Sequence, residues 1–333
     1  MSDSESMLSD LTLSDGVQGI CSSQTFGSEK RDPKENRKEP SIKVIRHVTK
    51  GIKSFTSLIK YSHDSLWLGD DKFDVIKHVK LTGDNIQVIS QIGIPVYDIA
   101  VTSDNNLLLS LLGETKLRLF NVNTGQGSDS RYNVASMCTF GIHVTKDQKV
   151  IIGADSTPFL HECRKVVIVM DKQGNRLTQY EHDNKNKPLF TLPHRITSTS
   201  NGNIWVVDHV ELYGNGRVVM LQQTRSNVQI YDGHPDINSP NKPFDPQDIL
   251  TTPEDNIIIT DRNNHTLHIL DHDGVIITYI RTDDVEIREP SSLALSGPGY
   301  FYIGCEFYMK GANYEHVNAK LYEVQYSGFE EIK

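Results

Sequence analysis

The sequence has 333 residues, of which 37% are hydrophobic, so it is long enough to bury a sizeable core. Its formal net charge of −9 gives the surface field the wrong sign for phosphate backbones, so we expect no DNA binding, and RNA binding would need a local basic patch. The four cysteines are widely separated and form no C-x-x-C pair, which excludes zinc-finger and thioredoxin-like sites.

The chain begins with MSDSESMLSDLTLSD, which carries acids where a secretory signal needs basic and then apolar residues. No stretch approaches the roughly 18 apolar residues of a membrane-spanning helix. We therefore expect a cytoplasmic protein that does not contact membranes.

Residues 1–40 are rich in Ser, Asp, Glu and Lys, and they are acidic first and then basic. They predict a disordered tail, because they cannot bury enough apolar area to offset the entropy of ordering.

Residues 41–333 consist of short apolar runs separated by turn pairs such as Asp-Asn and Asn-Gly. Six segments align without gaps on one plan, an apolar strand, a polar turn and a second apolar strand. They start near Phe55, Val96, Thr139, Pro193, Pro246 and Pro290. The spacing of roughly 41 to 54 residues is typical of propeller blades with four short strands each. The sequence therefore predicts an all-β, six-bladed β-propeller.

The segment SIKVIRHV, directly after the tail, has no blade of its own. We assign it as the outer strand of the last blade, beside AKLYEVQY and GFEEIK, so that an N-terminal strand closes the ring. A seventh blade would need another aligned segment after Lys310, and the remaining chain is too short for one.

The fifth unit, PFDPQDILTTPEDNIIITDRNNHTLHILDHDGVIITYI, resembles an NHL repeat, and the fourth and third units repeat its first and second halves. The first, second and sixth units lack the strand-terminal Asp and the Asn-His turn. The propeller as a whole resembles the C-terminal domain of tripartite-motif proteins, especially invertebrate members. Such proteins carry a RING domain, B-boxes and a coiled coil before the propeller. None of these three domains has a counterpart in this sequence, so we expect that the chain does not itself carry out the RING-dependent step of ubiquitin transfer.

The resemblance implies a non-enzymatic protein-interaction module, a substrate-recognition or adaptor propeller linked to ubiquitin-dependent regulation, with a protein partner. The first alternative is an RNA-binding NHL-type propeller, although basic residues such as Lys165 and Arg217 are interspersed with acids. The second alternative is a metal-dependent propeller hydrolase or lyase. We expect no catalytic residues and no cofactor, because the chain has no nucleophile elbow, no phosphate-binding loop and few ligands for a metal cage.

Equivalent positions of the six inner strands should form rings around the channel. The second position of each aligned segment predicts a partner-binding ring at one channel mouth, and the third position adds the next ring. The second-position residues are Thr56, Tyr97, Phe140, His194, Gln247 and Ser291. The third-position residues are Ser57, Asp98, Gly141, Arg195, Asp248 and Ser292.

Two strand-terminal acids, Asp208 and Asp261, precede tight turns, where a carboxylate accepts backbone N–H groups, so we interpret them as structural. His265, His268 and His272 are the densest histidine group. His268 lies within an alternating strand while the other two lie in the turns that flank it, so we expect no metal site there.

Overall fold

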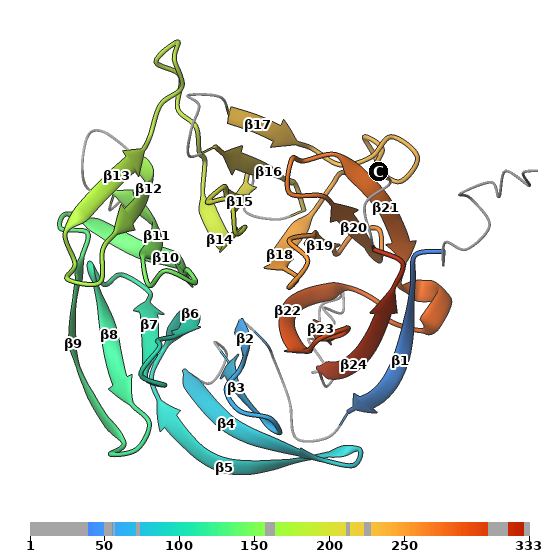
Figure 1. Cartoon of the computed structure of the whole chain (residues 1–333), viewed down its shortest axis with the longest axis horizontal. Coiled ribbons are helices and arrows are strands. Elements are labelled where there is room, and N and C mark those ends of the chain that lie inside the picture. The colour runs from blue at the N-terminus through green and yellow to red at the C-terminus, as the bar shows by residue number, and fades with distance from the viewer. Residues whose placement is uncertain are drawn as a thin grey trace, which may run out of the picture. The chain divides into compact units, whose positions relative to one another are not determined.

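The computed structural model describes residues 39–49, 55, 57–70, 74–156, 164–210, 214–222, 228–305 and 319–329. In this part of the chain the strands form six four-stranded antiparallel sheets, with one short 3-10 helix, η1 (Asp283–Val285). The sheets surround a channel as the blades of a six-bladed β-propeller (Figure 1). This arrangement confirms the predicted fold class. Residues 1–38 of the predicted tail lie outside the described residues, and no described helix is long and apolar enough to cross a membrane.

Each blade is built outward from the channel, one strand beside the next. The innermost strands are β2 (Ser57–Lys60), β6 (Val96–Val101), β10 (Met137–Val144), β14 (Pro193–Ser198), β18 (Pro246–Thr251) and β22 (Pro290–Gly297). The second strands are β3 (Ser65–Asp70), β7 (Leu107–Leu111), β11 (Val150–Ser156), β15 (Ile204–His209), β19 (Ile257–Asp261) and β23 (Tyr300–Cys305). The third strands are β4 (Val75–Thr82), β8 (Lys116–Asn121), β12 (Lys165–Met170), β16 (Gly216–Leu221), β20 (Thr266–Leu270) and β24 (Lys320–Ser327). The outermost strands are β5 (Asn85–Gly93), β9 (Gln126–Asn133), β13 (Arg176–Tyr180), β17 (Val228–Tyr231), β21 (Ile276–Arg281) and β1 (Ser41–Val48).

The turn after the inner strand is built in the same way in four blades, TSDNN, TKDQK, TSNGN and TPEDN. In each turn the first Thr donates its backbone N–H to the carbonyl of the fifth residue, as Thr145 does to Lys149 at 2.9 Å. The fourth residue has a positive φ, which favours Asn, Asp or Gly, and Gly202 takes this place with a φ of 84°. These turns hold the ends of the inner strands in fixed positions around one end of the channel.

Six apolar clusters hold the blades together, and each fills the interface between two neighbouring blades. Trp67 is buried between the first and second blades, where its ring stacks on His78, and Trp205 is buried between the fourth and fifth. A fully buried side chain of this kind contributes roughly 1.5–3 kcal/mol. The core is therefore a ring of inter-blade layers around the channel.

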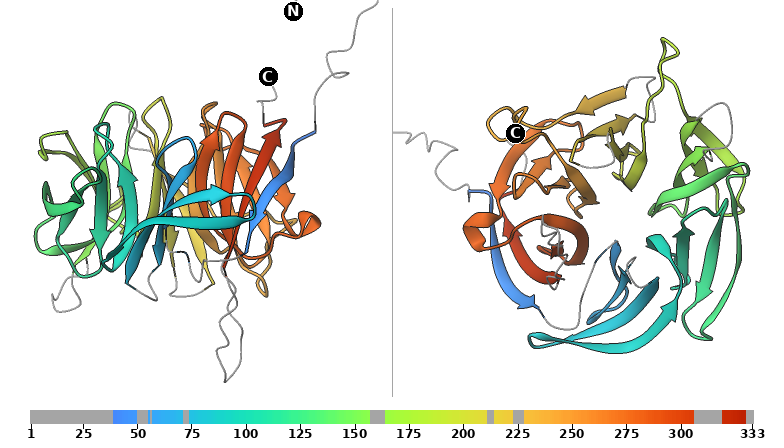
Figure 2. Two further views of the ribbon diagram at one scale, coloured as in Figure 1. Left: turned by 90° about the horizontal axis from the view of Figure 1, so that it is seen from below. Right: turned by 180° about the vertical axis from the view of Figure 1, so that it is seen from behind.

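The ring closes between the first and last strands of the described chain. Strand β1 pairs antiparallel with β24, with Val44 opposite Val324 and Val48 opposite Leu321. Figures 1 and 2 show the two strands side by side, β1 in blue and β24 in dark red. Arg46 adds an ion pair to Glu323 at 2.6 Å. The predicted closure by SIKVIRHV is confirmed, and it uses AKLYEVQY as its partner strand.

Candidate functional site

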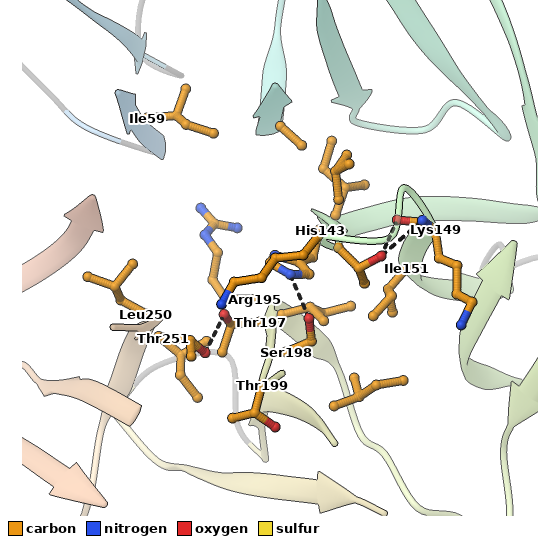
Figure 3. A pocket seen from close by; sticks show the side chains of 18 of the residues that line it. Ile59, His143, Lys149, Ile151, Arg195, Thr197, Ser198, Thr199, Leu250 and Thr251 are labelled. Carbon is orange, nitrogen blue, oxygen red and sulfur yellow. Dashed lines mark hydrogen bonds between the residues drawn. The ribbon is translucent and has the colours of Figure 1, made fainter. Parts of the chain in front are cut away.

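A cavity of about 990 Å³ occupies the channel between the six inner strands (Figure 3). It opens at the end of the channel where the inner strands finish, which we call the turn mouth because the hairpin turns surround it. Turn residues such as Lys146, Ser200 and Pro253 line this opening. We call the opposite end, where the inner strands begin, the start mouth. A concave site of this size is large enough for a small organic molecule.

Aliphatic side chains surround the cavity at one level of the channel, the fourth position of the aligned segments. These residues, the aliphatic belt, are Leu58, Ile99, Ile142, Ile196, Ile249 and Leu293. Each is between 4% and 7% exposed, since it packs between blades and leaves only a small surface toward the cavity. The belt gives the cavity an apolar wall in every blade.

Charged and hydroxyl side chains line the inner end of the cavity, at the third position of the segments. This set, the floor ring, is Ser57, Asp98, Gly141, Arg195, Asp248 and Ser292 in the order of the blades. Asp98, Arg195 and Asp248 all line the cavity and keep only 6–8% of their surface exposed. The sequence pattern identified these positions, and ring closure brings them to one level of the channel.

The two floor acids make matching hydrogen bonds in opposite blades. Asp98 accepts the backbone N–H of Ile99 and, from the next blade, that of Ile142, both at 2.9 Å. Asp248 accepts the N–H of Ile249 at 2.8 Å and, from the next blade, that of Leu293 at 2.7 Å. Each carboxylate therefore joins two neighbouring inner strands while it lines the cavity.

The electrostatics of the floor ring favour a proton-transfer group. Burial raises the pKa of Asp248 to about 7, with the charge of Asp98 adding to the rise and the Arg195 guanidinium opposing it. Burial also raises the pKa of Asp98. Nearer the turn mouth, burial lowers the pKa of His143 to about 4, so the imidazole is neutral at pH 7. Its Nε2 lies 2.9 Å from the hydroxyl of Ser198, within hydrogen-bond distance. A carboxyl group whose pKa lies near neutral pH can both take up and release a proton.

Two buried hydroxyls of the floor ring, Ser57 and Ser292, have no hydrogen-bond partner within the described part of the chain. They lie on neighbouring inner strands, β2 and β22, between the blades that carry Asp98 and Asp248. A buried hydroxyl without a partner costs free energy. Ser57 also lines the cavity, so it can bond a polar atom that enters there.

The described second-position residues lie beyond the floor ring, toward the start mouth, and do not line the cavity. Tyr97 hydrogen-bonds Nδ1 of His194, two blades away, and contacts Phe140 edge to face. His194 in turn stacks on His209, with ring centroids 4.1 Å apart. Gln247 donates to Asp245 at 2.7 Å. The aromatic residues thus bond with one another across the start mouth.

Ser291, the remaining described second-position residue, bonds within its own blade. The hydroxyl of Ser291 donates to the carbonyl of Gly304 in its own blade at 3.1 Å. Thr56 lies outside the described residues.

Gly141 allows the close approach of two inner strands at the start mouth. A Cβ at this position would lie 2.5 Å from the carbonyl oxygen of His194 and 3.1 Å from the Cα of Arg195. No side chain fits in that space without a backbone shift. The glycine therefore permits the geometry in which Tyr97 reaches His194.

The strand-terminal acids Asp208 and Asp261 are fully buried and lie away from the cavity. Asp208 accepts the N–H groups of Thr191 and Leu192, each at 2.7 Å, and pairs with Arg217 at 2.9 Å. Both acids lie at the ends of second strands, where they tie the incoming chain to the blade.

Asp261 accepts a weak bond from the N–H of Asp245 at 3.3 Å and side-chain bonds from Asn238 and Asn264. His268 lies in the same network, with Nε2 3.3 Å from Asp261 and Nδ1 2.7 Å from the hydroxyl of Tyr231.

The three clustered histidines have separate surroundings. His265 accepts the N–H of Glu289 through Nδ1 at 3.0 Å, and His272 lies 3.7 Å from Asp273. His268 is fully buried in the network of Asp261. Across the described residues no group of three or more His, Cys, Asp or Glu side chains is placed to hold a metal ion.

The floor ring offers a metal ion a poor set of donors. Both oxygens of Asp98 and both of Asp248 already accept backbone N–H groups, and the cationic Arg195 lies in the same ring. A hard cation such as calcium needs six or more oxygen ligands. These residues do not fit a metal.

The basic residues Lys165, Arg195 and Arg217 do not form an exposed cationic face. Lys165 lies 3.4 Å from Asp155, Arg217 pairs with the buried Asp208, and Arg195 lies inside the channel. An RNA-binding face needs a contiguous set of cations directed at solvent. The described residues named here do not supply one.

Several solved structures of enzymes share this fold. An aldose sugar dehydrogenase from Streptomyces coelicolor, in its PQQ-bound form, is 12% identical, with a TM-score of 0.60 over 87% of this chain and 99% of that chain. A luciferin-regenerating enzyme is 12% identical, with a TM-score of 0.58 over 89% and 99%. Virginiamycin B lyase from Staphylococcus aureus is 12% identical, with a TM-score of 0.54 over 86% and 99%. No family model and no curated protein sequence matches the chain. At this identity the likeness establishes a six-bladed propeller and nothing finer.

These comparisons correct the functional expectation. The prediction of a non-enzymatic interaction module linked to ubiquitin-dependent regulation was wrong, because the three solved structures described above, which share the fold along most of the chain, are enzymes. None of them points to tripartite-motif proteins. The error came from transferring a function through a fold-level motif, although one fold carries many functions. The sequence named the floor-ring positions as partner-binding residues, and it could not show how far burial raises the pKa values of Asp98 and Asp248.

Proposed function

We propose that this chain is an enzyme, a hydrolase or lyase that acts on a small carbonyl compound in the channel cavity. The observation that carries the proposal is the floor ring, where Asp98, Arg195 and Asp248 meet at the inner end of an otherwise apolar cavity. Enzyme folds of the same architecture support this class of function over a passive docking surface.

Asp248 is the proton-transfer group in this proposal. As a carboxylate it removes a proton, either from a water molecule that attacks the carbonyl carbon or from a carbon next to that carbonyl, and it returns the proton to the leaving group. Its raised pKa, about 7, keeps both protonation states populated at neutral pH. The backbone N–H groups of Ile249 and Leu293 hold the carboxyl group in place.

Arg195 stabilises the negative charge that develops on the carbonyl oxygen. Its guanidinium lies between the two floor acids in the order of the blades, and little water reaches it because it is 6% exposed. A positive charge in such a site is worth more than in water. Asp98 acts through these two residues, since it balances Arg195 and raises the pKa of Asp248. Asp98 is thus a positioning residue.

The test is a screen of esters, lactones and β-substituted carbonyl compounds, in which turnover is monitored by the release of protons or by the loss of the carbonyl absorbance. We expect Asp248→Asn to lower kcat by about 10²-fold or more, because it removes the proton-transfer group. Asp147→Asn, at the turn mouth of the same cavity, is the matched control and should retain the wild-type kcat. An Asp248→Asn variant as active as the wild type would contradict the proposal.

A further inference from the structure

The turn mouth of the cavity is cationic although the protein as a whole is anionic. Lys60, Lys146 and Lys149 line the cavity there, against a formal net charge of −9 for the chain. Lys149 is paired with Asp147 at 2.8 Å. Lys60 and Lys146 have no ion-pair or hydrogen-bond partner among the described residues. Two uncompensated positive charges therefore lie at the opening, on the first and third blades.

The charge at the other end of the cavity is balanced. Arg195 has Asp98 and Asp248 as neighbours in the floor ring, and both acids act on it electrostatically. An anion that entered the floor would meet Asp98 as well as Arg195. Among the charged residues that line the cavity, an anion at the turn mouth meets the three lysines and the paired Asp147. The surrounding hairpin turns also carry Asp104, Glu254 and Asp255, which do not line the cavity. Unpaired cations at the rim of a cavity with apolar walls concentrate anions there.

The aliphatic belt lies between these two ends. Its six side chains surround the path from the lysines to the floor ring, one from each blade. Lys60 lies three residues of inner strand beyond the floor ring, or roughly 10 Å, and Lys146 lies farther out, in the turn. A molecule that spans this distance buries an apolar body against the belt and keeps its charge at the mouth.

We propose that the substrate is an organic anion whose apolar body separates its anionic group from the carbonyl that reacts. The anionic group binds Lys60 and Lys146, the body packs on the aliphatic belt, and the carbonyl end reaches the floor ring. This inference rests on the proposed function for the role of the floor ring, whereas the binding of such an anion is independent of catalysis.

The experiment measures binding of octanoate and of its neutral counterpart octanamide to the full chain, by displacement of the fluorescent probe 8-anilinonaphthalene-1-sulfonate. We expect octanoate to bind more tightly. Lys60→Gln combined with Lys146→Gln should raise the Kd of octanoate about tenfold and leave that of octanamide unchanged. Lys43→Gln combined with Lys187→Gln changes the net charge equally on exposed residues away from the cavity, and should have no effect.

Chain length tests the belt without any substitution. From butanoate to octanoate we expect the affinity to rise about fourfold per methylene group, as complete burial of each methylene predicts. Equal binding of octanoate and octanamide, an unchanged Kd in the Lys60/Lys146 variant, or affinity that does not depend on chain length would each overturn the inference.

The Asp248→Asn variant separates this inference from the proposed function. Loss of turnover with intact octanoate binding supports both. Full turnover with lysine-dependent octanoate binding would reject the role of Asp248 and keep the binding site. Turnover that depends on Asp248, together with failure of the three binding outcomes above, would reject only the anionic substrate.

Discussion

The two mouths of the channel are made from the same six strands and differ in almost every property. At the start mouth, Tyr97 hydrogen-bonds His194 and packs on Phe140, and none of these three side chains lines the cavity. At the turn mouth, regular hairpin turns leave a cavity of about 990 Å³ with a cationic rim. The comparison shows that the side chains that are most conspicuous in the sequence are not the ones that line the cavity.

The largest expected effect concerns the pH dependence of stability at the floor ring. Asp248 has a pKa raised from 3.8 to about 7 by burial, so the folded state binds a proton more tightly than the unfolded state. Its contribution is complete below about pH 4 and is lost as the pH rises toward 7. Relative to Asp248→Asn, the wild type should lose about 4 kcal/mol of unfolding free energy between these values.

Urea denaturation at several pH values measures this difference. Asp147→Asn at the open rim is the control, because Lys149 and Thr145 hold the pKa of Asp147 below its ordinary value, so its contribution is small and has the opposite sign. Parallel stability curves for the wild type and Asp248→Asn would show that the floor ring is not desolvated as the structure describes.

The next largest effect should come from Gly141→Ala, which tests the close packing of the start mouth. The added Cβ would meet the carbonyl oxygen of His194 at 2.5 Å, so the two inner strands must separate. We expect a loss of about 2–3 kcal/mol in unfolding free energy. Gly127→Ala, where a Cβ meets nothing within 4 Å, should change stability little. Equal stability of both variants would show that the two inner strands do not approach each other closely at Gly141.

A smaller effect is expected from Tyr97→Phe, which keeps the ring and removes the hydroxyl. His194 then loses its hydrogen-bond partner in a buried position, which should cost about 1–2 kcal/mol. Because the substrate enters by the turn mouth, kcat should stay at the wild-type value. A large fall in kcat for a variant that remains folded at the assay temperature would place the start mouth in the catalytic path.

The smallest expected effect is that of a chelator. Among the described residues no group of three or more His, Cys, Asp or Glu side chains is placed to hold a metal ion, and Arg195 adds a positive charge to the floor ring, so activity should be unchanged after treatment with EDTA. Activity that disappears with EDTA and returns with one divalent cation would show that residues beyond the floor ring complete a metal site.

The sequence predicted much of the site without identifying its function. The gap-free alignment placed Asp98, Arg195 and Asp248 at one level of the channel, and the same alignment contains the aliphatic belt as six Leu or Ile residues at its fourth position. These six aliphatic residues are the sequence signal from which an apolar cavity wall could have been predicted. The alignment could not tell which mouth is open, because the contact between Tyr97 and His194 crosses the intervening blade.

The sequence by itself determined the number of blades, the hairpin turns and the closing strand, because each depends on local patterns that repeat within one blade or on the pairing of two identifiable strands. Only the tertiary structure decided where the cavity opens, which charges remain unpaired at its rim and how far the pKa of Asp248 rises. These properties depend on neighbours from other blades, which ring closure brings together, and on the exclusion of water by residues far apart in the chain.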